Sequence, residues 1–169
     1  MTGEAQPRWI RASILVGAGF FITALVVSAL FDPTIRVLHA LQALIYVAVI
    51  VTTRRDSAWG FGAGCVISVV WNCVNLILTT FIWSGLRQVA MLVRTGHMDR
   101  PEMLVAVVAC GGHVLLIVAC LAGFLRTRPR AAQWARFAAG GVLALAYFAL
   151  IIVTTGPQYV VLIERALGL

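Results

Sequence analysis

The charged residues divide this chain into long uncharged stretches, and these stretches decide what it can fold into. Five of them contain no Asp, Glu, Lys or Arg: residues 12–31, 37–53, 57–86, 103–125 and 137–163. A helix needs about 20 apolar residues to cross the hydrocarbon core of a bilayer. Because lipid offers no partner to backbone N–H and C=O groups, a membrane-crossing segment must satisfy them within regular structure. The sequence therefore predicts five transmembrane helices.

The composition agrees with a membrane-embedded chain. Hydrophobic residues make up 62% of the 169 residues and charged residues only 11%, whereas a soluble domain carries roughly a quarter charged residues. The predicted fold is all-α, a polytopic membrane helix bundle that forms one integral membrane domain over residues 1–169. We place its spans at residues 12–31, 37–53, 59–83, 103–125 and 137–155.

The connection between the third and fourth spans predicts a short interfacial helix. On a helical projection four apolar residues share one face, namely Leu86, Val89, Ala90 and Val93. The charged side chains of Arg87 and Arg94 lie away from that face. A helix that is apolar on one side and charged on the other lies in the plane of the membrane surface. We expect it on the outer leaflet.

The basic charge of the chain is explained by membrane orientation. The net charge is +7, and all 13 basic residues are arginines that fall in the connections between spans or near the chain ends. In a soluble protein this charge would suggest nucleic acid, which we do not expect as a partner here. Eight arginines lie on the side of the N-terminus and five on the opposite side. By the positive-inside rule, the N-terminus is cytoplasmic and the C-terminus periplasmic or extracellular, in a bacterial inner membrane.

Polar residues within the spans form stripes at helical spacing. At about 100° per residue, Ser68, Asn72, Asn75 and Thr79 of the third span share one face. His39, Gln42 and Tyr46 form a similar stripe on the second span, and the fourth span adds His113. By depth, these groups converge on the outer half of the bundle. The predicted ligand-binding residues are His39, Gln42, Tyr46, Asn72, Asn75, Thr79 and His113.

Two interpretations of these stripes stay open. Asparagine and histidine side chains can hydrogen-bond between helices at roughly 0.6 kcal/mol each, which would make them packing groups. Alternatively they line a polar pocket that opens toward the periplasm. The asparagines alone favour packing, whereas two histidines together with Gln42 favour a site, because buried imidazoles are costly to keep for packing alone.

The functional hypothesis follows from what the spans lack. No Asp, Glu, Lys or Arg lies inside any span, which disfavours carboxylate-based proton coupling and paired-carboxylate acid–base catalysis. We expect the pocket to bind a small or lipophilic ligand, and transport of that ligand across the membrane is an open extension of this hypothesis. One alternative is a membrane enzyme acting on a lipid or isoprenoid, with His39 or His113 as acid or base. Another is an accessory subunit, or a homo-oligomer, whose polar stripe docks a partner helix.

Cofactors and metals are not expected. His39 and His113 could ligate haem b, but their depths differ by about 9 Å at about 1.5 Å per residue, and two axial ligands of one iron lie nearly level. In the loop, His97, Asp99 and Glu102 could bind a metal. Ordinary solvated loop polarity is the simpler explanation for these three residues.

The orientation can be tested with reporter fusions. Fusions after Arg55 and within residues 126–136 should report a cytoplasmic position, and a fusion at His97 should report the opposite side. The physical reason is the excess of arginine on the N-terminal side. A periplasmic signal from residues 126–136 would contradict the assignment.

Overall fold

A computed structural model describes residues 6–156, 160–161 and 164 of the chain. Its long helices are α1 (Arg8–Phe31), α2 (Arg36–Thr53), α3 (Ala58–Cys73), α4 (Phe81–Thr95), α5 (Leu104–Arg126) and α6 (Ala131–Thr155). Three short helical segments join them: η1 (Pro33–Ile35), η2 (Val74–Leu78) and η3 (Pro101–Met103). Within the described residues, five helices are long and apolar enough to cross a membrane. The predicted all-α bundle of five spans is confirmed.

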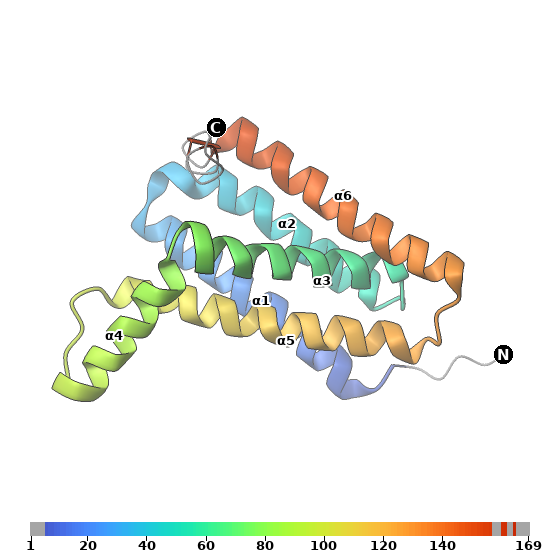
Figure 1. Cartoon of the computed structure of the whole chain (residues 1–169), viewed down its shortest axis with the longest axis horizontal. Helices are drawn as coiled ribbons and strands as arrows, with labels where there is room; N and C mark the ends of the chain where they lie inside the picture. The colour runs from blue at the N-terminus through green and yellow to red at the C-terminus, as the bar shows by residue number, and fades with distance from the viewer. Residues whose placement is uncertain (1–5, 157–159, 162–163, 165–169) are drawn as a thin grey trace.

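The five candidate membrane spans lie side by side, and α4 projects from one end of them (Figure 1). The most extensive contacts join α1 to α5 and α3 to α6, with further packing of α3 on α5 and of α1 on α2. The described start of α1 and the connections 54–57 and 127–130 share one end, which we call the arginine-rich end. The opposite end carries residues 32–35 and α4, and we call it the α4 end.

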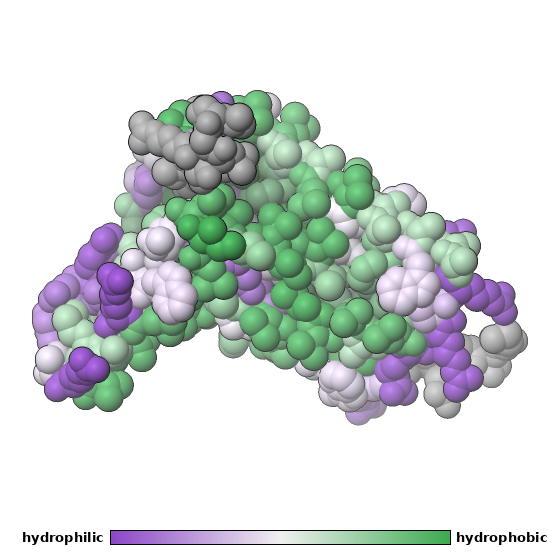
Figure 2. Space-filling model, viewed as in Figure 1, coloured by the Kyte–Doolittle hydropathy of each residue, from purple (hydrophilic) through white to green (hydrophobic). Residues whose placement is uncertain are grey.

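The surface of the bundle is that of a multi-pass membrane protein. Figure 2 shows hydrophobic residues over the middle of the visible face and hydrophilic residues gathered at the two ends. Exposed side chains such as Val26, Val142 and Ile77 are large and apolar. In a soluble monomer an apolar surface of this extent would be unusual, and contact with lipid acyl chains accounts for it.

Two spans begin earlier in the structure than predicted. Helix α1 starts at Arg8, directly after Pro7, and α6 starts at Ala131, before Trp134 and Arg136. The predicted starts followed the last charged residue of each segment. Arginine and tryptophan are tolerated in the first turns because their polar tips reach the interface while their apolar parts pack below it.

The third span ends earlier than predicted. Helix α3 continues as the π-helical segment η2, in which the Thr79 N–H bonds the Val74 carbonyl at 3.0 Å. Thr80 then adopts φ 56°, a left-handed conformation that is uncommon for a residue other than glycine. Trp83 therefore belongs to α4, and its placement in the span was wrong. Asn75 donates to the Trp71 carbonyl at 2.9 Å, a side-chain bond of the kind that competes with regular helical bonding.

Helix α4 has the amphipathic character predicted for an interfacial helix. Ile82 and Gly85 are its buried residues, and a Cβ at Gly85 would lie 2.6 Å from the Met103 carbonyl oxygen, so α4 meets the chain closely just before α5. The predicted apolar face is exposed, with Leu86, Val89 and Val93 all among the exposed side chains. Its contact with the outer leaflet stays a prediction.

Glycines set the closest helix approaches. A Cβ at Gly17 of α1 would lie 2.7 Å from the Gly112 carbonyl oxygen of α5, and a Cβ at Gly112 would lie 2.8 Å from that of Gly17. In lipid, where helices gain no hydrophobic driving force against one another, such close approach supplies the packing. Gly19, two residues further along α1, has open space around its Cβ position.

Gly17→Ala and Gly19→Ala form a matched pair that tests this packing. We expect Gly17→Ala to lower the free energy of unfolding by about 1–3 kcal/mol, because the added methyl overpacks the α1–α5 contact. Gly19→Ala should be neutral or stabilising by up to about 1 kcal/mol, since alanine favours the helix. Denaturation of the purified proteins in mixed micelles measures both changes. Equal effects would contradict the close contact.

Candidate functional site

A cavity of about 610 Å³ lies at the α4 end of the bundle. Residues of α1, α2, η2, α5 and α6 line it, so that it opens between helices that are distant in sequence. Its walls are mostly apolar and aromatic, including Phe21, Leu25, Leu38, Trp71 and Phe148. Both the volume and the apolar walls are typical of sites for small molecules.

The structure divides the seven predicted site residues into two groups. Four of them line the cavity: His39, Gln42, Asn75 and Thr79. The other three, Tyr46, Asn72 and His113, are absent from its lining and are hydrogen-bonded to one another. What the sequence predicted as one site is therefore a cavity and a neighbouring polar chain.

The polar chain runs across three helices. The Tyr46 hydroxyl of α2 lies 2.8 Å from Nε2 of His113 on α5, and Nδ1 of His113 lies 3.3 Å from Oδ1 of Asn72 on α3. An amide oxygen only accepts hydrogen bonds, so in this arrangement Nδ1 of His113 donates to Asn72. Nε2 of the neutral ring then accepts from the Tyr46 hydroxyl. Both ring nitrogens of His113 are engaged, and the residue is buried.

Phe21 of α1 separates this chain from the cavity. Its ring centroid lies 4.0 Å from that of His113 and 4.5 Å from that of Tyr46, and the same side chain lines the cavity. A ligand in the cavity would therefore meet Phe21 before the imidazole of His113. In this position His113 packs between helices beside the cavity. This is the role that the sequence favoured for the asparagines.

His39 and Gln42 supply the polar groups of the cavity wall. His39 Nδ1 lies 3.0 Å from the Leu25 carbonyl oxygen and donates to it, which leaves Nε2 as an acceptor. Gln42 is 1% exposed, and its Oε1 has no hydrogen-bond partner among the described residues. Most buried polar groups are hydrogen-bonded, so the unpaired amide oxygen of Gln42 requires an explanation.

Asn75 and Thr79 line the cavity but bond locally. Asn75 donates to the Trp71 carbonyl, and its Oδ1 accepts from the Thr79 hydroxyl at 3.3 Å. These bonds hold the turns of η2 together and occupy both ends of the Asn75 amide. Asn75 and Thr79 therefore shape the cavity wall, whereas His39 and Gln42 each keep an acceptor atom that is not hydrogen-bonded within the described residues.

Sequence reasoning missed several lining residues. Trp71 lines the cavity with a buried indole Nε1 that has no partner in the described part of the chain. The spacing Trp71, Asn75, Leu78 follows helical periodicity, so the tryptophan could have been assigned to the wall. Phe21 carries no such signal, because nothing in its neighbourhood distinguishes it from a lipid-facing phenylalanine.

Charged residues lie at the mouth of the cavity. Asp32, Arg100 and Glu102 are among its lining residues, and Arg100 Nε donates to Glu102 Oε1 at 2.9 Å. Hydrogen bonds from the hydroxyl and the backbone N–H of Thr34 hold the pKa of the Asp32 carboxyl below its usual value. The side chains at the mouth are therefore ionised at neutral pH, whereas the described side chains of the interior are neutral.

The weak metal candidates are only partly brought together. His97 Nε2 lies 3.5 Å from Asp99 Oδ1, but Glu102 pairs with Arg100. Within residues 6–156 and the other described positions, no group of three or more His, Cys, Asp or Glu residues could hold a metal ion.

Removing the Tyr46 hydroxyl tests the polar chain. Tyr46→Phe leaves Nε2 of His113 without a donor inside the bundle, and an unpaired buried polar group costs about 1–3 kcal/mol. Tyr147→Phe is the control: its hydroxyl donates at 3.2 Å to the Leu41 carbonyl, which keeps its helical partner. We expect Tyr46→Phe to lower the free energy of unfolding by about 1 kcal/mol more than the control. No difference between the variants would refute the chain.

Comparison with known proteins yields no match. No protein-family model, curated protein or solved structure is significantly similar to this chain. The cavity combines a mostly apolar wall with two neutral polar side chains, His39 and Gln42, which keep acceptor atoms without a partner among the described residues.

Proposed function

We propose that this protein binds a neutral lipophilic molecule in the cavity at the α4 end. The ligand carries a hydrogen-bond donor such as a hydroxyl group, which meets His39 and Gln42, and an apolar body that packs on the aromatic wall. With the orientation inferred from the arginines, the cavity opens toward the periplasm of a bacterial inner membrane.

The buried amide of Gln42 is the observation that carries this proposal. Its Oε1 is a buried acceptor without a hydrogen-bond partner among the described residues. A buried polar group left in this state costs about 1–3 kcal/mol, and a ligand hydroxyl would offset that cost. Because Oε1 is covered by neighbouring atoms in this conformation, the Gln42 side chain must rotate toward the cavity as the ligand enters.

The chemistry of the wall favours a neutral ligand. Nε2 of His39 and Oε1 of Gln42 are both acceptors, and the indole Nε1 of Trp71 is a donor. Among the described residues that line the cavity, the charged ones are Asp32, Arg100 and Glu102, which lie at its mouth. An ionised group deep in this apolar site would lack a counter-charge, and its burial would be costly.

Binding is better supported than passage through the membrane. Phe21 and the Tyr46–His113 pair lie in aromatic contact next to the cavity, on the side toward the middle of the bundle. A ligand that crossed would have to displace both the aromatic contact and the 2.8 Å hydrogen bond. We therefore propose a binding function and assign no transport step.

An enzymatic function has one supporting observation. The unprotonated Nε2 of His39 in the cavity wall is a group that could accept a proton from a lipid or isoprenoid substrate. His113 is a poor acid–base candidate, because both of its nitrogens are bonded and Phe21 covers it. The same two bonds would have to break before His113 could ligate haem together with His39.

Filling the cavity tests the proposal. Ala106→Phe places a ring into the lining, while Val108→Phe adds the same ring at an exposed position of the same helix. Each protein is purified from native membranes and its bound small molecules are measured by mass spectrometry. We expect a lipophilic molecule with a hydroxyl group to co-purify with the native chain and with Val108→Phe, and to fall at least about tenfold in Ala106→Phe because the ring takes its space.

The test has a clear negative outcome. If Ala106→Phe folds, as judged by circular dichroism, and carries the same bound molecules as Val108→Phe, the cavity is not a binding site. Gln42→Leu provides a second variant that keeps the volume and removes the polar atom. It should weaken retention of a hydroxyl-bearing ligand and should leave the fold intact.

A further inference from the structure

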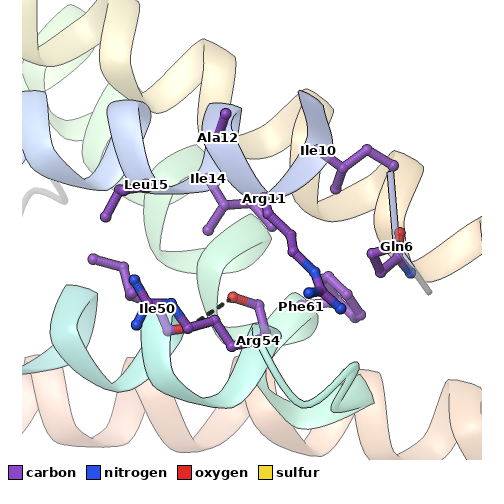
Figure 3. A pocket seen from close by; sticks show the side chains of 10 residues that line it. Gln6, Ile10, Arg11, Ala12, Ile14, Leu15, Ile50, Arg54 and Phe61 are labelled. Carbon is purple, nitrogen blue, oxygen red and sulfur yellow. Dashed lines mark hydrogen bonds between the residues drawn. The ribbon is translucent and has the colours of Figure 1, made fainter. Parts of the chain in front are cut away.

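A second cavity lies at the arginine-rich end of the bundle, far from the one described above. It measures about 270 Å³ and is formed where α1, α2 and the start of α3 meet (Figure 3). Two arginines line it from different helices, Arg11 on α1 and Arg54 directly after α2. Phe61 of α3 lines it as well.

The two arginine side chains extend in opposite directions along the cavity (Figure 3). In Figure 3 the Arg11 side chain extends toward Phe61, and the Arg54 side chain extends along α2 toward Ile50. The ion pairs within 4.0 Å in the described part of the chain join His97 to Asp99 and Arg100 to Glu102, all at the other end. Among the described residues, the guanidinium groups of this cavity therefore have no carboxylate partner.

Thr53 and Gln6 also line the cavity, and their donors are engaged, whereas Gln6 Oε1 is a buried acceptor with no partner among the described residues. The Thr53 hydroxyl donates to the Val49 carbonyl at 2.6 Å, and Gln6 Nε2 donates to the Gly123 carbonyl at 2.8 Å. The second of these bonds ties the segment before α1 to α5. The free donors of the cavity are thus the guanidinium groups, which together carry two positive charges.

Apolar side chains adjoin the charged part. Leu15 of α1 and Ile50 of α2 line the same cavity one turn deeper in the bundle than the arginines, and Leu15 is exposed on the outer surface. The cavity therefore combines a cationic region at the level of the helix ends with an apolar strip that faces the hydrocarbon. This combination matches an anionic headgroup joined to acyl chains.

We propose that this cavity binds the phosphate group of an anionic phospholipid. Guanidinium groups bind phosphate oxygens through paired hydrogen bonds, and basic pockets between transmembrane helices are known receptors for anionic headgroups. If the arginines acted only on membrane orientation, every arginine at this end would contribute equally to lipid affinity. A binding site predicts instead that Arg11 and Arg54 contribute more than the others.

Two double variants with the same loss of charge distinguish these cases. Arg11→Gln with Arg54→Gln removes both cavity arginines, whereas Arg55→Gln with Arg128→Gln removes two exposed arginines of the same end that do not line the cavity. The full-length proteins are titrated in detergent with phosphatidylglycerol or phosphatidylcholine, and bound lipid is counted by native mass spectrometry.

The native chain should bind phosphatidylglycerol more tightly than phosphatidylcholine. Each arginine near an anionic lipid surface contributes about fivefold to affinity. Arginines that bind the headgroup directly in a site should contribute more than this. We therefore expect the cavity variant to lose at least about tenfold more affinity for phosphatidylglycerol than its matched control. Equal losses in the two variants would overturn the proposal in favour of diffuse surface charge.

Two further arms complete the test. Millimolar inorganic phosphate should leave the bound lipid in place, and displacement by phosphate would overturn the lipid assignment in favour of a soluble phosphate ligand. If the cavity double variant fails to fold, Arg54→Gln is compared with its neighbour Arg55→Gln in the same titration. Equal affinities in that pair would likewise overturn the proposal.

Discussion

Lipid cannot hydrogen-bond a polar side chain, and the interior of this bundle is organised around that constraint. Tyr46, His113 and Asn72 satisfy one another across three helices, and His39 bonds the Leu25 carbonyl of a fourth. Each of these bonds also joins two helices and so fixes their relative position. Gln42 Oε1 has no hydrogen-bond partner in the described part of the chain. A hydrogen bond from a ligand would therefore contribute most in the cavity beside Gln42.

The same constraint separates the two ends of the molecule. At the α4 end the cavity is neutral inside and charged only at its mouth, which suits a neutral lipophilic guest. At the arginine-rich end the smaller cavity carries two guanidinium groups beside apolar walls, which suits an anionic headgroup. The two cavities lie at opposite ends of the bundle, and between them α1 and α5 are in close contact where Gly17 meets Gly112.

The spans were predictable from the sequence because charges are excluded from the hydrocarbon, and the polar stripes were predictable because helical periodicity places Asn72 and Asn75 on one side. The division of those residues into a cavity and a polar chain was not predictable. It depends on Phe21, whose position follows from the packing of α1 against α5 and from no local pattern. The early end of the third span was also hidden, since η2 and the left-handed Thr80 lie within an uncharged stretch that continues to residue 86.

Thiol labelling at the α4 end tests most directly whether this cavity is an open site. Thr79→Cys and Ile77→Cys are made separately in a background that lacks the four native cysteines. Thr79 lines the cavity, and Ile77 is 72% exposed on the surface assigned to lipid. Only a hydrated thiol ionises and reacts readily, so a membrane-impermeant maleimide should label position 79 from the outside and leave position 77 unmodified. An unreactive position 79, or equal labelling of the two, would contradict the existence of a pocket open at this end.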